Sequence, residues 1–213
     1  MLIIEKALNE LHNNVKSMTD VVTNMVRNID KAIQNESYDN LEYIFEQDQY
    51  LDNLEKETDQ QSIELLALIN PRATDLRYVF SVIKLDVDLE RIGDECKNIA
   101  RELQNVKTPL PDELKAMSTE VLKMIVDVFT ALRNRDATLA KEVVLADDIV
   151  DTMEYEILQK YKDSLELAFS AKALERIADH STNVAEKVVF TVEGLDIRHE
   201  NSLISRIKDK KNK

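Results

Sequence analysis

An internal repeat constrains the fold of this 213-residue chain more than any other feature of the sequence. The twelve residues at 89–100 return at 174–185 with seven identities. Two of the five differences, Gly for Ala and Ile for Val, are conservative. A chain that repeats itself has to be interpreted first as two copies of one structural unit.

The repeat extends beyond these phrases, and its second copy is shorter. A shift of 99 residues relates the segments that precede the phrases, whereas the phrases themselves need a shift of 85. The residues paired by the longer shift include Met18 and Met117, Asn35 and Asn134, and Asp48 and Asp147. The missing 14 residues equal about four helical turns, two from each arm of a hairpin if the register is kept. We therefore expect a second hairpin shorter by about 10 Å.

Apolar residues recur at helical spacing along nearly the whole chain, which contains only 2 Gly and 3 Pro. We therefore predict an all-α fold of two tandem three-helix bundles, with the shortened hairpin in the second. The six helices are expected at about 4–34, 38–69, 72–104, 113–133, from 137 to a turn near 163, and 164–193. The first bundle should occupy 1–106, the second 107–194, and a tail 195–213.

Turn-forming residues set these boundaries. Ser37 is the expected N-cap of the second helix, and Asn70-Pro71 should separate the second helix from the third. A capping box at 163–166 should open the sixth helix, and Gly194 should end it.

Composition excludes several classes of protein. The net charge of −13 argues against general nucleic-acid binding, which depends on Lys and Arg, and is compatible with cation binding. No stretch approaches the roughly 18 consecutive apolar residues of a membrane span. The single cysteine fits a reducing compartment, and residues 1–12 lack a signal-peptide core, so we expect a cytoplasmic protein.

Each copy of the repeated phrase carries a stripe of acidic side chains. Glu90 and Asp94 are four residues apart and share one face of a helix, and Glu175 and Asp179 repeat this arrangement. The apolar residues of the phrase lie nearly opposite. We therefore expect the carboxylates to face away from the core of their own helix.

The preceding helix carries acids at the same height. Asp48 and Asp52 precede Pro71 by the same stretch of chain by which Glu90 and Asp94 follow it. Because the two helices form an antiparallel hairpin with its turn at Pro71, the acidic pairs should be level with each other.

The second copy keeps this alignment in spite of its shorter hairpin. Asp147 and Asp151 lie as far before the turn at Asp163 as Glu175 and Asp179 lie after it. The candidate metal ligands are therefore Asp48, Asp52, Glu55, Glu90 and Asp94 in the first copy, and Asp147, Asp151, Glu154, Glu175 and Asp179 in the second.

Carboxylates crowded at one level repel one another unless a positive charge lies among them. One candidate is a hard or borderline cation: iron, manganese, magnesium or calcium, with zinc less typical. The other is arginine, from Arg91, Arg101 or Arg176, in a metal-free helical interaction scaffold. A single acidic pair is expected by chance on helix surfaces, but recurrence at level heights in both copies favours the metal.

The sequence gives little indication of catalysis. His12, His180 and His199 are isolated, and there is no Glu-x-x-His motif, Gly-rich phosphate loop or Cys-x-x-Cys. A carboxylate-bridged metal enzyme would need an internal site open to substrate, whereas the stripes are expected to face outward. We therefore expect that the protein is not an enzyme.

Four segments carry a family signature. They are PRATDLR at 71–77, LERIGD at 89–94, LERIADH at 174–180 and VEGLDIRH at 192–199. These segments resemble the PhoU family of phosphate-transport regulators, and the resemblance extends over nearly the whole chain. The shortened second hairpin departs from the family pattern because it lacks the Asp-Leu-Arg segment, so a partner that touches this tip could meet only the first copy.

The resemblance implies a six-helix protein whose Glu/Asp-x-x-x-Asp motifs hold metal, often as iron clusters. Those motifs correspond here to the acidic pairs of both copies. It also implies a negative regulator of the phosphate-starvation response that links the ATPase subunit of a phosphate ABC transporter to a sensor histidine kinase. Such a protein would reach the membrane through its partners and form a homodimer.

Overall fold

Six helices form the protein, and they lie where the apolar periodicity predicts them. The computed structural model describes residues 2–39, 41–69 and 73–197, and these contain no strand. The helices are α1 (Leu2–Asn35), α2 (Glu42–Ile69), α3 (Ala73–Leu103), α4 (Asp112–Asn134), α5 (Ala137–Lys160) and α6 (Leu165–Glu193). The predicted all-α class is confirmed, and no helix in the described ranges is long and apolar enough to cross a bilayer.

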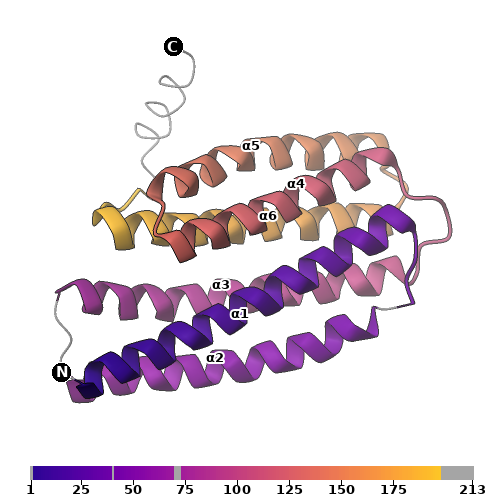
Figure 1. Cartoon of the computed structure of the whole chain (residues 1–213). Helices are drawn as coiled ribbons and strands as arrows, with labels where there is room; N and C mark the ends of the chain where they lie inside the picture. Colours follow the sequence, from indigo (N-terminus) through magenta and orange to yellow (C-terminus); the bar gives the residue numbers. More distant parts are fainter. Residues whose placement is uncertain (1, 40, 70–72, 198–213) are drawn as a thin grey trace, which may run out of the picture.

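The helices form two groups of three that lie side by side (Figure 1). Helices α1, α2 and α3 pack on one another, as do α4, α5 and α6, and the groups meet where α3 contacts α6 and α1 contacts α4. Helix α2 ends and α3 begins at one end of the molecule, whereas α5 ends and α6 begins at the other. The two repeats therefore run in opposite directions. The exact domain limits, 106/107 and 194/195, stay a prediction.

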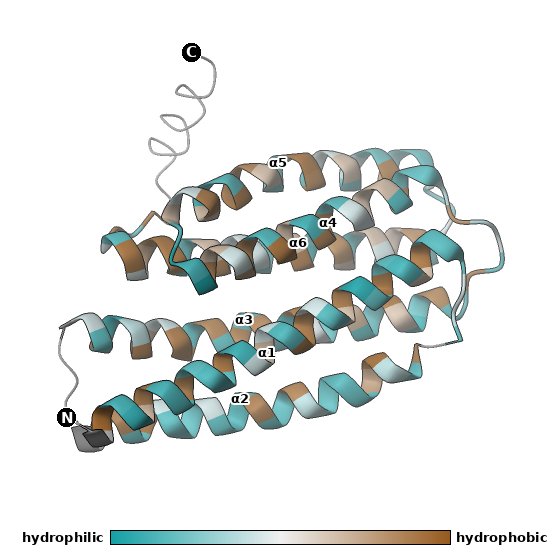
Figure 2. Cartoon of the chain, in the orientation of Figure 1, coloured by the Kyte–Doolittle hydropathy of each residue, from teal (hydrophilic) through white to brown (hydrophobic). Residues whose placement is uncertain are grey.

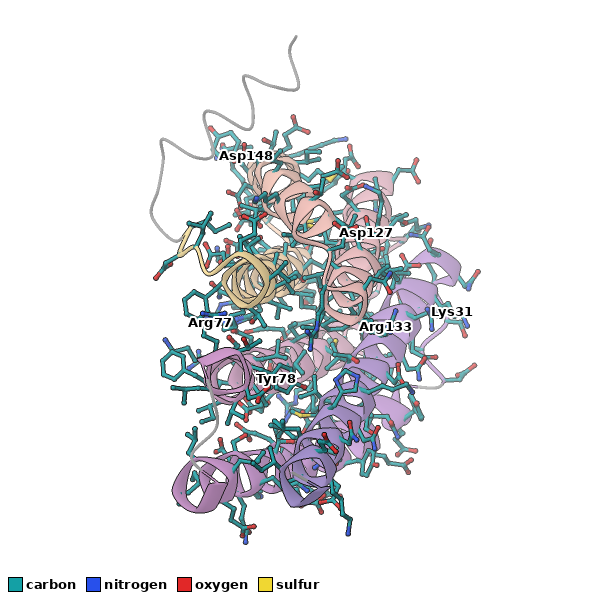
Figure 3. The ribbon with its side chains drawn as sticks, turned by 60° about the vertical axis from the view of Figure 1, so that its left-hand side comes forward. Lys31, Arg77, Tyr78, Asp127, Arg133 and Asp148 are labelled. Atoms are coloured by element: carbon teal, nitrogen blue, oxygen red, sulfur yellow. The ribbon has the colours of Figure 1, made fainter. Side chains whose placement is uncertain are left out.

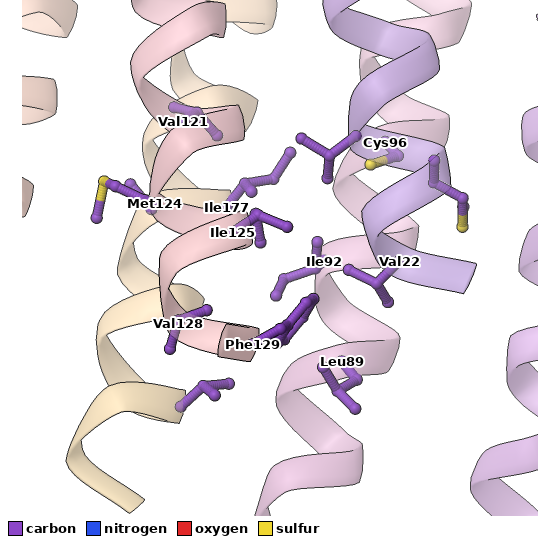
Figure 4. Close-up of a cluster of buried hydrophobic side chains, with 14 of the residues drawn as sticks. Val22, Leu89, Ile92, Cys96, Val121, Met124, Ile125, Val128, Phe129 and Ile177 are labelled. Carbon is purple, nitrogen blue, oxygen red and sulfur yellow. The ribbon is translucent and has the colours of Figure 1, made fainter. Parts of the chain in front are cut away.

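One hydrophobic core joins the two groups. Apolar residues line the inward faces of the helices, and polar residues cover the outward faces (Figure 2). Phe129, which is fully buried, points from α4 toward Leu89 and Ile92 of α3 (Figure 4). Cys96 is buried in the same core, as its place among apolar residues predicts. Burial of each such large side chain stabilises the fold by about 1.5–3 kcal/mol, so the bundles are held together mainly by this shared core.

The second hairpin is shortened on both of its arms, as the sequence predicts. Helix α2 continues from Asp48 to Ile69, whereas α5 ends at Lys160, much sooner after the equivalent acid Asp147. Helix α3 begins at Ala73, far ahead of Glu90, whereas α6 begins at Leu165, closer to the equivalent acid Glu175. Each arm therefore loses about two turns, and the acids keep their common level.

The ends of α1 and α4 repeat the same backbone conformation. Glu36 and Arg135, which are equivalent under the repeat, both adopt the left-handed region, with φ of 51° and 52°. Beyond Glu36, the amide of Ser37 donates to the carbonyl of Ala32, and the equivalent bond closes α4. This is a Schellman arrangement built without glycine.

Two details of the predicted helix starts were wrong. Ser37 is not the N-cap of α2, because the chain first makes a turn in which the Leu41 amide donates to the Tyr38 carbonyl, and α2 begins only at Glu42. This turn buries Leu41. The predicted break at Asn70-Pro71 and most of the tail lie outside the described residues.

The start of α6 also differs in its capping residue. Ser164, rather than Asp163, is the N-cap, and its hydroxyl accepts a hydrogen bond from the Leu167 amide. The same hydroxyl donates to Glu166, so the expected capping interaction is displaced by one residue. Gly194 ends α6 with φ of 72°, as predicted.

Helices α2 and α3 approach each other closely at Gly93. A Cβ atom added there would lie 2.7 Å from Cδ2 of Leu51, which is fully buried. At the equivalent positions of the second bundle stand Ala178 and Val150, both fully buried. In both repeats the first arm of the hairpin carries the larger residue and the second arm the smaller one, but the second repeat has a smaller large residue and a larger small one.

We expect Gly93→Ala to lower the free energy of unfolding by about 1 kcal/mol, because overpacking outweighs the gain in helix propensity. Leu51→Val alone should cost about as much through the cavity that it leaves. The double variant reproduces the pair of the second bundle and should return close to wild type in urea denaturation. Additive losses in the double variant would contradict this account of the contact.

Candidate functional site

The first acidic cluster lies along the contact between α2 and α3. It consists of Asp48, Asp52, Glu55, Glu90 and Asp94. Asp48 is buried, and the other four are partly exposed. The side chains from α2 and α3 are close enough for their charges to act on one another, as the pKa shifts below show. The predicted alignment of the two acidic pairs at one height is therefore present.

A lysine holds one end of this cluster together. Nζ of Lys97 lies 2.6 Å from Oδ2 of Asp48 and 2.7 Å from Oδ1 of Asp94. Burial raises the pKa of Asp48 above its usual value, although the bond from Lys97 opposes the shift. Lys97 thereby joins α2 to α3 through a pair of charge-assisted contacts.

The remaining acids of the cluster have no ion pair within the described part of the chain. Burial, followed by the charges of Asp94 and Glu55, raises the pKa of Glu90 to about 7. Burial and the nearby Asp59 and Asp52 also raise the pKa of Glu55. Glu90 therefore resists ionisation up to near-neutral pH, and the pKa of Glu55 is shifted in the same direction, as crowded carboxylates are in the absence of a cation.

The cluster continues for one more turn in the first repeat. Asp86, which lies four residues before Glu90 on α3, is almost completely buried. Burial and the neighbouring Asp59 of α2 raise the pKa of Asp86 to about 8. Asp86 is not among the candidate ligands predicted from the sequence, although its spacing of four from Glu90 places it on the same face of the helix. Its equivalent in the second repeat is Ala171, so this extension belongs to the first repeat alone.

The second acidic cluster lies between α5 and α6 and consists of Asp147, Asp151, Glu154, Glu175 and Asp179. Burial and the charges of Asp179, Asp151 and Glu175 raise the pKa of Asp147 to about 7. Burial also raises the pKa values of Asp151 and Asp179, with Glu175 adding to both shifts. The two helices thus present their acids to one another as the sequence predicts.

A lysine also neutralises part of the second cluster, but at its opposite end. Nζ of Lys172 lies 2.9 Å from Oε2 of Glu175 and 3.5 Å from Oε1 of Glu154. The first cluster keeps Asp52, Glu55 and Glu90 outside an ion pair among the described residues, and the second keeps Asp147, Asp151 and Asp179. Each cluster of five therefore retains three carboxylates that form no ion pair with a described basic residue.

Two expectations for the acids need correction. The arginine alternative is wrong in its choice of residue: Arg176 pairs with Glu95 at 2.9 Å, Arg101 contacts Asn98 and the Phe45 ring, and Arg91 has no ion pair with a described residue. Lysines pair with the acids instead: Lys97 in the first cluster and Lys172 in the second.

The outward orientation of the stripes is only partly right. Asp94 and Asp151 are well exposed, whereas Asp48 is buried. Its Oδ2 contacts Lys97 across the interface between α2 and α3, so Asp48 lies on the side of α2 that packs against α3 rather than on the solvent side.

His180 contributes to a separate ionic contact that joins the two bundles. Its Nδ1 lies 3.0 Å from Oδ1 of Asp88, a buried acid of α3 that also accepts hydrogen bonds from Asn183 and Lys187 of α6. Burial alone would raise the pKa of Asp88, but the bonds from His180 and Lys187 outweigh it, and the pKa is lowered. From the sequence, His180 was expected to be an isolated histidine, so this contact with Asp88 was not predicted.

The donor atoms suit a hard cation, although they do not yet surround one. Among the described residues, no three acidic, His or Cys side chains converge on a single point in the way that metal ligands do. Oδ1 of Asp147 is buried without a hydrogen-bond partner. All donors are carboxylate oxygens, the ligands preferred by calcium, magnesium and manganese and accepted by iron. Carboxylate side chains would have to rotate inward to complete a coordination sphere.

Comparison with known proteins identifies close relatives of both repeats. The sequence model of the PhoU domain matches residues 15–103 and again 114–188. The phosphate-specific transport system accessory protein PhoU homolog 1 of Thermotoga maritima is 29% identical over 210 residues, covering 91% of this chain and 90% of that protein. The PhoU homolog of Aquifex aeolicus is 32% identical over 211 residues, covering 92% and 96%.

Solved structures show the same fold. The crystal structure of PhoU from Pseudomonas aeruginosa superposes with a TM-score of 0.83 at 27% identity, covering 90% of this chain and 99% of that one. The phosphate transport system regulatory protein PhoU from Streptococcus pneumoniae gives a TM-score of 0.82 at 25% identity, covering 91% and 98%.

The raised pKa values predict how stability depends on pH. The folded state binds more protons than the unfolded state between about pH 4 and the folded pKa values, about 7 for Glu90 and Asp147 and about 8 for Asp86. The contribution of these groups is therefore complete at low pH and is lost as pH rises through this window. In the absence of divalent cations, the free energy of unfolding should therefore fall between pH 5 and 8, by on the order of several kcal/mol, because all three groups lose their extra protons in this window.

Asp86→Asn should flatten this pH dependence, because the amide cannot ionise. Asp163→Asn, a change at an exposed acid far from both clusters, should leave the slope as in wild type. Chemical denaturation at a series of pH values in a chelating buffer measures both. An equal slope in wild type and Asp86→Asn would show that Asp86 does not titrate in this window.

Proposed function

Because the chain belongs to the PhoU family, we propose that it is an accessory protein of a phosphate transport system and that it regulates phosphate uptake. The observation that carries this proposal is the match of the PhoU domain to both repeats, together with relatives that align over about nine-tenths of the chain. The names of those relatives support a role in phosphate transport.

We further propose that the protein acts in the cytoplasm as an adaptor between the ATPase subunit of a phosphate ABC transporter and a sensor histidine kinase, and restrains the phosphate-starvation response. An exposed apolar face on α3 supports a role in contacts of this kind. Leu76, Phe80 and Val87 recur at helical spacing and are 46%, 48% and 41% exposed. Monomeric proteins seldom leave such aligned apolar residues uncovered unless a partner covers them.

This face also addresses the asymmetry of the two hairpins. Leu76 lies on the two turns of α3 that the second repeat lacks, whereas Phe80 corresponds to Leu165, the exposed first residue of α6. The part of the partner contact that Leu76 makes should therefore involve the first repeat alone. A second copy of the chain is the other proposed partner, in a homodimer.

Leu76→Ser combined with Phe80→Ser should abolish co-purification of the transporter ATPase subunit and the kinase from detergent-solubilised membranes, without changing the denaturation midpoint. Ile63→Ser combined with Tyr155→Ser removes two more exposed large apolar residues, at 61% and 63%, from other elements and serves as the control. Retention of both partners by the Leu76/Phe80 variant would contradict the proposed face, and loss in the control would show that exposure alone decides.

The acidic clusters would supply cation binding to this regulator. We propose that Asp52, Glu55 and Glu90 hold one site with Asp48 and Asp94 at its edge, and that the second set of five acids holds the other. Iron is the leading cation, with manganese, magnesium or calcium as alternatives; zinc suits an all-oxygen donor set less well. Burial and then repulsion raise the pKa values of Glu90 and Asp147, and a cation there would remove the repulsion.

A metal-free scaffold is the second candidate, and one observation favours it. Lys97 already bridges Asp48 of α2 and Asp94 of α3, and Lys172 bridges a different pair, Glu154 of α5 and Glu175 of α6, in the second cluster. If these lysines satisfy the clusters, the protein would bind partners through its helices alone. The two candidates differ in the behaviour of the three unpaired acids in each cluster.

Protein purified without chelators should contain iron or manganese, and both metals should raise its melting temperature. Asp52→Asn/Glu90→Gln should remove the metal of the first cluster only, and Asp147→Asn/Asp151→Asn that of the second, each lowering the metal content by about half. Glu46→Gln/Glu57→Gln removes two exposed acids from another face of α2 and should change nothing.

Elemental analysis and thermal denaturation measure these outcomes. A wild-type protein that is metal-free, and is not stabilised by either metal, would favour the scaffold. Unchanged metal content in a variant that combines all four of these cluster substitutions would place the metal elsewhere.

A further inference from the structure

A cavity of about 270 Å³ lies on the seam between the two bundles, away from both acidic clusters. Its walls come from the first half of α1, the first half of α3, the end of α4 and the end of α6. Figure 3 views the molecule toward this end, with Tyr78 of α3 and Arg133 of α4 on the two sides of the seam. The volume is close to the lower limit, about 300 Å³, of typical small-molecule sites.

The chemistry of the cavity is opposite to that of the protein as a whole. The chain carries 41 acidic and 28 basic residues, yet the residues that line the cavity include no Asp or Glu. The basic lining residues are His12, Lys16, Arg133, Arg135 and Lys187. The rest of the wall is mainly aliphatic, with Val15, Val82, Leu85, Leu132 and Val188.

Hydroxyl groups add hydrogen-bonding capacity to this apolar wall. The Tyr78 hydroxyl lies 3.3 Å from Nδ1 of His12, and the Thr191 hydroxyl donates to that of Ser81 at 3.0 Å. Burial raises the pKa of Tyr78 to about 12, so its hydroxyl remains a donor at physiological pH. The wall can therefore bind an apolar ring or chain, and its rim can bind an anionic group.

The internal repeat provides a comparison for this end of the seam. At the opposite end, the equivalents of Arg133 and Arg135 are Gln34 and Glu36. Glu36 forms an ion pair with Lys115 at 2.6 Å, and Gln34 donates to the Lys115 carbonyl at 2.8 Å. These bonds tie α1 to α4. Lys115 is itself the equivalent of Lys16.

At the cavity end, the same three positions hold only cations, so the α1–α4 contact cannot close in this way. Lys187 of α6 continues the pattern, because its equivalent in the first repeat is Glu102. Four positions thus carry Lys16, Arg133, Arg135 and Lys187 here, whereas the other end places one lysine, one glutamine and two glutamates. The two ends of the seam therefore differ at these positions, and the end with the cavity is the more positively charged.

Part of this positive charge is already paired. Lys16 and Arg133 lie 3.0 Å and 3.7 Å from the exposed Asp20, and Lys187 contacts Asp88. Arg135 makes no ion pair with a described residue. An anion at the rim could therefore bind Arg135 directly. To bind Arg133, it would have to displace only the solvent-exposed carboxylate of Asp20.

We propose that this cavity is a binding site for a small organic anion, with an apolar or aromatic body against the aliphatic wall and a phosphate, sulfonate or carboxylate group at Arg133 and Arg135. Guanidinium groups bind such oxyanions in a bidentate manner, and the apolar wall accounts for the rest of the ligand. The site is independent of the acidic clusters.

Two fluorescent probes that differ only in charge test this site. 1-Anilinonaphthalene-8-sulfonate carries the ring system and an anionic group, whereas N-phenyl-1-naphthylamine carries the same rings without the sulfonate. Arg133→Gln/Arg135→Gln should weaken the binding of the sulfonate probe at least about tenfold, while binding of the neutral probe should change by less than about twofold. Lys84→Gln/Arg101→Gln removes two positive charges elsewhere on the surface and should leave both affinities unchanged.

Energy transfer can locate the probe, because the chain contains no tryptophan. A single tryptophan introduced by Val192→Trp at the rim should transfer energy efficiently to the bound sulfonate probe, and one introduced by Tyr155→Trp on exposed α5 should transfer much less.

Arg133→Gln/Arg135→Glu, which copies the residues of the closed end, should abolish the binding of the sulfonate probe.

Three results would overturn the proposal: equal affinity of the sulfonate probe for wild type and the Arg133/Arg135 variant, an equal loss in the Lys84/Arg101 control, or equal energy transfer from both tryptophans. Parallel weakening of both probes in the arginine variant would also overturn it, because it would show that the cavity has collapsed rather than lost its anion contacts.

Discussion

Repulsion among carboxylates buried along a contact between two helices is the constraint on which this structure depends. Five acids lie along α2 and α3 and five more along α5 and α6, and burial penalises the charged forms of six of them: Asp48, Glu55, Glu90, Asp147, Asp151 and Asp179. A helix pair with this composition can close only if acids bind protons, if lysines reach them or if a cation binds between them. Protons are favoured at Glu90, Asp86 and Asp147, and lysines lie at one end of each cluster. The proposed metal would bind between the acids that form no ion pair with a lysine.

The two repeats meet this constraint in different ways, and the differences are informative. Lys97 and Lys172 do not correspond under the repeat, so each copy has placed its lysine independently. Their effect is nevertheless the same: three carboxylates per cluster remain outside any ion pair among the described residues. The seam between the bundles diverges further, because one end is closed by Glu36 and Gln34 and the other is left open by Arg135 and Arg133. Duplication thus set the architecture, and substitution at a few positions gave the two ends opposite chemistry.

Much of the fold and the alignment of the acids could be predicted because both follow from counting along regular helices. The distances of Asp48 and Glu90 from Pro71 determine their common height, and the shortening of the second hairpin divides evenly between its two arms. What could not be predicted depends on contacts between helices. In the sequence, Lys97 resembles an ordinary surface residue, and only the packing of α2 on α3 brings Asp48 to it. Arg133 likewise resembles a solvated residue at a helix end, and only the packing of α1 and α3 forms the cavity that it lines. The N-cap of α2 was wrong because the buried Leu41 requires an extra turn, which local sequence does not reveal.

Anomalous X-ray scattering from manganese-loaded crystals tests the central claim most directly. The account predicts anomalous peaks within about 2.5 Å of carboxylate oxygens in both clusters, one set between α2 and α3 and one between α5 and α6, with the side chains of Asp52, Glu90 and Asp151 turned toward them. Crystals that take up manganese only at other positions, while Lys97 and Lys172 remain on their carboxylate partners, would contradict it.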